Sequence, residues 1–164
     1  MAGTIATVTG WARLLRAMAV VTVILALPAN ASATLGRDTS SVDADRVRMQ
    51  GALLRIARSD TYTVHEMRSS TGTTVREYVS PNGTVFAVAW QGPWLPDLRQ
   101  VLGAYFDDYQ RALQTTSGKR KARGSITIDL PDLTVQMTGH PRAFSGRAFV
   151  PRLMPLRVQA ETIR

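Results

Sequence analysis

Apolar residues recur at intervals of three and four over residues 96–113, the clearest periodic segment of the chain. On a helix these residues share one stripe: Leu98, Val101, Leu102, Tyr105, Phe106, Tyr109 and Leu113. Pro96 suits a first helical turn, and Asp97 would lie at the positive end of the helix dipole. The pattern predicts one long amphipathic helix over residues 96–113.

A weaker helical pattern covers residues 40–56. A serine at its start can cap a helix, and Asp43 and Asp45 would follow in the first turn. Gly51 lowers the helix propensity of the segment. We therefore expect a helix that ends near residues 55–58.

Three runs in the middle of the chain are rich in β-branched and aromatic residues, which favours strands over residues 62–68, 74–80 and 84–91. Turn sequences separate the runs, and the pair Asn82-Gly83 is a preferred centre for a tight hairpin. The pattern predicts an antiparallel meander of three strands, which the long helix would cover.

The last third of the chain contains further short strand patterns. Residues 125–130 and 133–138 alternate on either side of a Pro-Asp turn, and residues 143–150 are a candidate for a third strand. Four basic residues between two glycines suggest an exposed loop at 117–124, whereas the tail 151–164 has no assignable pattern.

Together these elements indicate an α+β fold. It would consist of an N-terminal helix, a meander of three antiparallel strands packed by a long amphipathic helix, and two or three further C-terminal strands. The length after residue 33 suits a single domain over residues 34–164. The chain has no cysteine, so its apolar core rather than disulfide bonds must hold the fold together.

The first 33 residues have the pattern of a secretion signal. Arg13 and Arg16 precede an apolar run over residues 17–27, and small residues at 31–33 suit cleavage by signal peptidase. The apolar run of 11 residues is shorter than the ~20 that cross a bilayer. We expect removal of residues 1–33, a periplasmic or secreted protein, and no membrane span in the mature chain.

The formal net charge is +8 for the whole chain and +6 for residues 34–164, which have 18 basic and 12 acidic residues. Such a charge favours contact with anionic surfaces, although it can serve solubility alone. Outside the cytoplasm the available polyanions are envelope components and acidic proteins rather than nucleic acid. The expected partner is therefore an anionic envelope component or a partner protein.

Six runs of residues carry a family resemblance: 62–66, 76–81, 85–93, 96–100, 139–140 and 142–148. These runs resemble a family of exported Gram-negative proteins, domain of unknown function 2844. The resemblance extends over residues 34–164. It implies export and a single domain, and it implies no activity, cofactor or catalytic residue.

Two groups of residues are candidates for binding. Arg142 and Arg147 lie near His140 in a segment with two glycines, and arginines on loops can hold a carboxylate or phosphate through two hydrogen bonds. The alternative is that the glycines form turns and the arginines face water. Trp90 and Trp94 would form a platform for a sugar or peptide if exposed, but we favour Trp90 in the core and Trp94 at the helix entry.

The rival hypothesis is a small hydrolase or metal-dependent enzyme that uses His65, Glu66, Glu77 and His140. The loop length of the first hairpin decides whether Glu66 lies opposite Glu77 or opposite Arg76. We favour Arg76, with His65 opposite Glu77, because carboxylates that face each other repel.

No phosphate loop, zinc-ligand spacing, dinucleotide fingerprint or catalytic triad occurs in the sequence. We therefore expect no cofactor, no metal site and no catalytic residue. The favoured function is a non-catalytic envelope-binding or accessory module.

Overall fold

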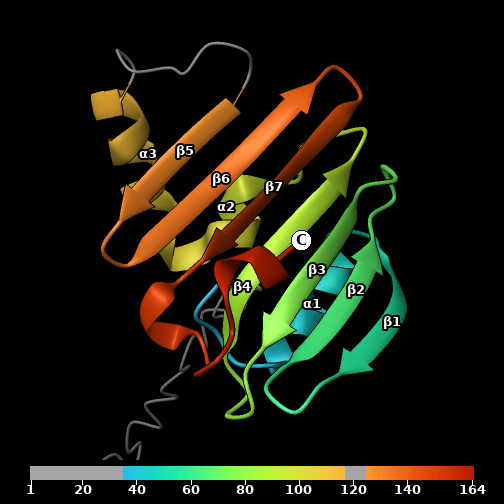
Figure 1. Cartoon of the computed structure of the whole chain (residues 1–164). Coiled ribbons are helices and arrows are strands. Elements are labelled where there is room, and N and C mark those ends of the chain that lie inside the picture. The colour runs from blue at the N-terminus through green and yellow to red at the C-terminus, as the bar shows by residue number, and fades with distance from the viewer. Residues whose placement is uncertain (1–34, 117–124) are drawn as a thin grey trace, which may run out of the picture.

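The computed structural model describes residues 35–116 and 125–164. Its centre is one antiparallel sheet of seven strands in the order β1-β2-β3-β4-β7-β6-β5 (Figure 1). The strands are β1 (Ala52–Arg58), β2 (Thr63–Arg68), β3 (Thr74–Val79), β4 (Val85–Gly92), β5 (Ser125–Leu130), β6 (Leu133–His140) and β7 (Ala143–Phe149). The α+β class is confirmed, but the predicted meander is only part of a larger sheet. The predicted signal segment and basic loop lie outside the described residues.

The sheet is assembled from two runs of hairpins. Strands β1 to β4 pair in chain order, and strands β5 to β7 do the same. The two runs join where β7 pairs with β4, with Phe149 opposite Ala87 and Phe144 opposite Gly92. The prediction of strands at residues 62–91 and at 125–150 is confirmed.

The N-terminal helix is shorter than predicted. Helix α1 (Ser40–Arg48) is followed by a turn in which Gln50 has a positive φ of 47°, and the chain then enters strand β1. A Cβ on Gly51 would lie 2.9 Å from the backbone oxygen of Arg68, so the turn needs a glycine there. The predicted start of the helix at residue 40 is confirmed, but its predicted end near residues 55–58 is wrong because pairing with β2 outweighs the helix propensity of the segment 52–58.

The long helix predicted over residues 96–113 is also interrupted. It consists of α2 (Leu98–Leu102), a 3-10 turn η1 (Gly103–Tyr105) and α3 (Phe106–Thr116). Gly103 has φ 50° and ψ −118°, a conformation that ends α2. The side chain of Asp97 accepts hydrogen bonds from the backbone of Arg99 and Gln100 and caps α2.

The two faces of the sheet are covered by different parts of the chain. The helices lie behind the sheet in Figure 1, on what we call the helix face, and the C-terminal segment 151–164 crosses the other side, the outer face. Trp90, Val101 and Leu102 are central to the helix-face core. Phe86, Tyr78 and Ile163 form a smaller cluster under the C-terminal segment.

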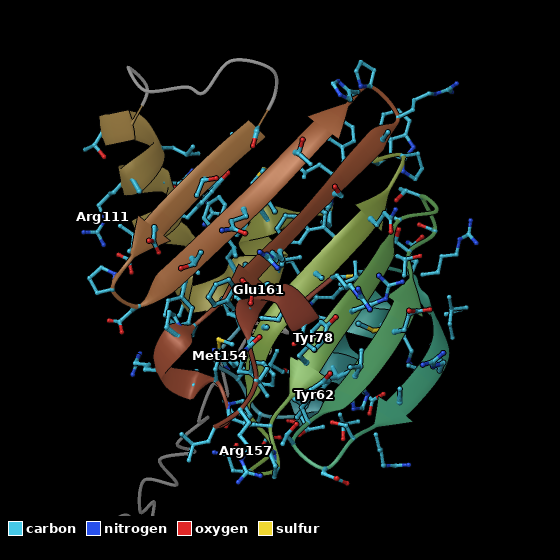
Figure 2. All side chains as sticks on the ribbon, viewed as in Figure 1. Tyr62, Tyr78, Arg111, Met154, Arg157 and Glu161 are labelled. Carbon is cyan, nitrogen blue, oxygen red and sulfur yellow. The ribbon has the colours of Figure 1, made fainter. Side chains whose placement is uncertain are left out.

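The C-terminal segment has no regular pattern in the sequence, yet it packs against the outer face of the sheet. It contains two 3-10 turns, η2 (Pro151–Leu153) and η3 (Ala160–Thr162). Figure 2 shows Met154 and Glu161 of this segment in front of the sheet, near Tyr78. None of the helices in the described part of the chain is long and apolar enough to cross a bilayer.

Candidate functional site

The outer face carries a groove of about 620 Å³ beside the C-terminal segment. Its floor is built by strands β4, β7, β6 and β5, whose alternate residues point to this face. Polar side chains at these positions are Gln91, Ser125, Thr127, Gln136, Thr138, Ser145 and Arg147, while Ile163 and Arg164 of the C-terminal segment form a wall.

Strand register arranges these side chains in two rows across the sheet. In one row Ser145 lies opposite Gln91 on β4 and opposite Thr138 on β6. In the other row Gln136 lies opposite Arg147 on one side and opposite Thr127 on the other. Neighbouring strands are about 4.8 Å apart, so each row presents hydrogen-bonding groups at regular intervals.

Arg147 is the charged centre of the groove and is half-buried. Its Nε donates to Oε1 of Gln136 at 2.8 Å, and its Nη1 donates to the backbone oxygens of Ala160 at 2.6 Å and Ile163 at 3.2 Å. The arginine therefore holds the C-terminal segment against β7. Its Nη2 makes no hydrogen bond to any residue that the structure describes, which leaves part of the fork for a ligand.

A second pocket of about 540 Å³ lies on the other side of residue 164. Here Nε of Arg76 contacts Oε2 of Glu66 at 2.6 Å. The backbone oxygen of Arg164 accepts hydrogen bonds from Arg76 and from the hydroxyl of Tyr78, the latter at 2.9 Å. The two pockets share Gln91 and Arg164, so the end of the segment separates them.

The two tryptophans that would form a platform if both were exposed are separated by the fold. The side chain of Trp90 is on the helix face and 2% exposed, whereas Trp94 follows β4 and is 55% exposed. The placement of Trp90 in the core is confirmed. A Cβ on Gly146 would overlap the Trp90 ring, so the floor of the groove at Gly146 is bare backbone lying on the indole.

His140 and Arg142 lie at the turn between β6 and β7, where both are exposed. Arg142 has a positive φ of 68°, which places it at the tip of the turn. Neither residue lines the groove, although His140 is only two residues beyond Thr138. Among the predicted binding residues, Arg147 has its side chain in the groove and Trp90 lies beneath it.

The residues of the rival enzyme hypothesis do not form one cluster. The register of the first hairpin is the favoured one, with His65 opposite Glu77 and Glu66 opposite Arg76. His65 and Glu77 therefore face the helices, while Glu66 is on the outer face. His140 is on β6, with β3, β4 and β7 between it and β2. Among the described residues no group of three histidines, cysteines or acids could hold a metal ion.

Glu77 instead belongs to a buried polar cluster under α1 that sequence reasoning missed. Burial, and next a hydrogen bond and charge repulsion with Asp45, raise the pKa of Glu77 well above its ordinary value. Burial lowers the pKa of His65, with an opposing contribution from Asp43 and a reinforcing one from Arg58. Asp45 also accepts a hydrogen bond of 2.7 Å from Nε2 of Gln100.

The polar rows of the groove were also missed by the sequence reasoning. A signal for them is present, because serine, threonine and glutamine alternate with apolar residues through β5 and β6. Such alternation indicates one solvated face and does not distinguish a flat surface from a groove. The wall that makes the groove comes from the C-terminal segment, which has no sequence periodicity.

Comparison with known proteins agrees with the family resemblance seen in the sequence. No curated protein sequence and no solved structure matches the chain. The family model described as a protein of unknown function, DUF2844, matches residues 31–163, which is most of the chain. The chain therefore belongs to the DUF2844 family of proteins of unknown function.

Proposed function

We propose that this protein is an exported, non-catalytic module of the bacterial envelope that binds an acidic polysaccharide in the outer-face groove. The observation that carries the proposal is the lining of the groove. It combines two rows of neutral hydrogen-bonding side chains with two arginines, Arg147 in the floor and Arg164 in the wall.

The chemistry of this lining suits a ligand rich in hydroxyl groups. Hydroxyl and amide side chains can both donate and accept hydrogen bonds, as sugar hydroxyls do. The free part of the Arg147 guanidinium can meet a carboxylate or phosphate of the ligand. A groove open along the sheet can hold part of a long chain.

The same lining supports a role without catalysis. The described residues that line the groove include no aspartate, glutamate, histidine or cysteine. Ser125 and Ser145 therefore have no neighbouring general base in the groove, and a serine is a weak nucleophile without one. Binding is the function that these residues can perform.

Export is supported by the sequence. The first 33 residues have a basic start, an apolar run and a cleavage pattern, and the net charge of +6 on the residues after them (18 basic minus 12 acidic) favours anionic partners. An acidic envelope polysaccharide is a polyanion that an exported protein would meet.

A titration with two oligosaccharides of equal length tests the proposal. The probes are a neutral dextran oligosaccharide and an oligosaccharide of uronic acid units. We expect the purified protein to bind the uronate probe, and Thr127→Tyr to weaken binding about tenfold or more because the ring fills the groove. Thr71→Tyr, at an exposed turn between β2 and β3, is the matched control and should bind as the unaltered protein does.

Arginine-to-lysine changes test the role of Arg147. Arg147→Lys keeps the charge but loses the planar fork, so it should weaken uronate binding, whereas Arg142→Lys outside the groove should not. Binding of neither probe, or equal loss in Thr71→Tyr and Thr127→Tyr, would contradict the proposal.

A further inference from the structure

Two carboxyl groups meet in the interior between α1 and the sheet. Asp45 on α1 is 1% exposed and Glu77 on β3 is 2% exposed. Gln100 on α2 donates from Nε2 to Oδ1 of Asp45 at 2.7 Å, so three elements converge on this pair. The cluster lies on the helix face, away from the groove.

The contact between the two side chains needs a proton. Hydrogen bonding to Asp45 is one of the causes that raise the pKa of Glu77, and a bond between two carboxyl groups exists only while one of them is protonated. Oε2 of Glu77 and the hydroxyl of Ser41 have no hydrogen-bond partner in the described part of the protein. A second negative charge on Glu77 would therefore be buried beside an existing one, which is costly.

Asp45 is one of the few side chains that α1 buries against the rest of the protein. Among the side chains described for α1, the buried ones are Ser41, Val42 and Asp45, and only Val42 is apolar. The residue before the helix, Thr39, makes no side-chain capping hydrogen bond. The ends of α1 are also held, because Oγ1 of Thr39 donates to the backbone oxygen of Gly83 at 2.8 Å and the amide of Ser70 donates to the backbone oxygen of Met49 at 3.4 Å.

Other charged groups lie on the elements around Asp45 and Glu77. His65 on β2 lies opposite Glu77, and its lowered pKa favours the neutral ring. Arg46 on α1 contacts Asp43 at 3.6 Å, and Arg58 is on the edge strand β1. Arg99 on α2 lies over the ring of Phe106 at 4.4 Å. Arg48 lies in the last turn of α1, three residues beyond Asp45.

We propose that α1 is a proton-dependent latch, which docks on the sheet while Asp45 and Glu77 share one proton and detaches when both are ionised. The raised pKa of Glu77 fixes the direction of the effect. Docking is complete below the ordinary glutamate pKa of 4.5 and is lost as the pH rises through the higher pKa of the folded state. Detachment would uncover the part of the helix-face core that includes Val42 and Leu35.

His65 acts in the opposite direction and can be separated experimentally. Because its pKa is lowered in the folded protein, its contribution to stability is complete above the ordinary value of 6.5 and is lost as the pH falls. His65→Gln should therefore remove an acid-side loss of stability while the alkaline release of α1 remains.

Hydrogen exchange of peptides spanning residues 40–48, measured from about pH 5 to about pH 9 and corrected for the intrinsic rate, tests the latch. In the purified protein, raising the pH should lower the protection of α1 until both carboxyl groups are ionised. The total loss of protection should be about tenfold for each unit by which the pKa of the pair in the folded state exceeds its pKa in the unfolded state. Glu77→Gln should keep α1 protected across this range, because an amide can donate to ionised Asp45. Glu66→Gln, on the outer face, is the matched control and should retain the pH dependence.

If Glu77→Gln does not fold, the carboxyl carbon resonances of Asp45 and Glu77 in the unaltered protein provide a second measurement. One of them should titrate well above 4.5, together with the loss of α1 protection. Protection of α1 that is constant with pH in the unaltered protein would overturn the latch. So would a Glu77→Gln variant that loses protection as the unaltered protein does, or carboxyl resonances that both titrate at ordinary values.

Discussion

Single residues in this protein have roles that their type alone does not reveal. Arg147 was selected from the sequence as an arginine on a glycine-bearing loop, but it lies within β7 and holds the C-terminal segment through Ala160 and Ile163. Arg147 lines the groove, and its role in binding stays a prediction. Its partners could not be predicted because they come from a segment without periodicity.

Gly146 is a second residue whose role depends on a partner distant in the sequence, and it provides a prediction at the scale of single residues. Gly146→Ala should destabilise the protein by about 1–3 kcal/mol, because the new methyl group would overlap the Trp90 ring and lie close to the backbone oxygen of Gln136. Denaturant unfolding measures the change. Ser145→Ala, one residue away and open to the groove, should cost less than about 0.5 kcal/mol, and equal effects at the two sites would argue against this packing.

At the scale of helices and strands, the sequence predicts the elements that neighbouring residues determine and does not predict the features that depend on distant contacts. Strands β2 to β4 follow from alternation and from turns such as Asn82-Gly83, which are contained in a few neighbouring residues. The sequence predicts helix for most of strand β1, because the conformation of this segment depends on pairing with β2 and not on its own propensity. The break at Gly103 was hidden because the apolar stripe continues on both sides of it.

The interrupted helix gives a prediction for two of its apolar residues. Leu102 is 0% exposed, so Leu102→Ala should cost about 2–5 kcal/mol through the cavity that it leaves. Phe106 lies just after the break and is only half-buried, so Phe106→Ala should cost clearly less. Thermal unfolding of both variants measures the difference, and a larger loss at Phe106 would contradict the described packing.

For the molecule as a whole, fold class could be predicted from the sequence and the site could not. Two runs of strands and two helical segments suffice to indicate an α+β domain. To predict the groove, one must know that β7 pairs with β4 and that residues 151–164 lie on the outer face. Both depend on contacts between distant parts of the chain.

Processing of the N-terminus is a prediction about the whole chain. If the protein is exported, its mature form should begin at or near Thr34, after the small residues at 31–33 that suit signal peptidase. N-terminal sequencing of protein recovered from outside the cytoplasm measures this directly. Recovery of an intact Met1 in the membrane fraction would indicate a retained anchor instead.

The pairing of β4 with β7 has a consequence for the order in which the chain can fold. Strands β1 to β4 are complete long before β7 is synthesised, and β4 is buried from Val85 to Trp90 in the finished protein. Until β7 arrives, this apolar strand is an open edge that can pair with another chain. Fragments that stop before residue 143 should therefore aggregate, although most of the sheet is already encoded in them.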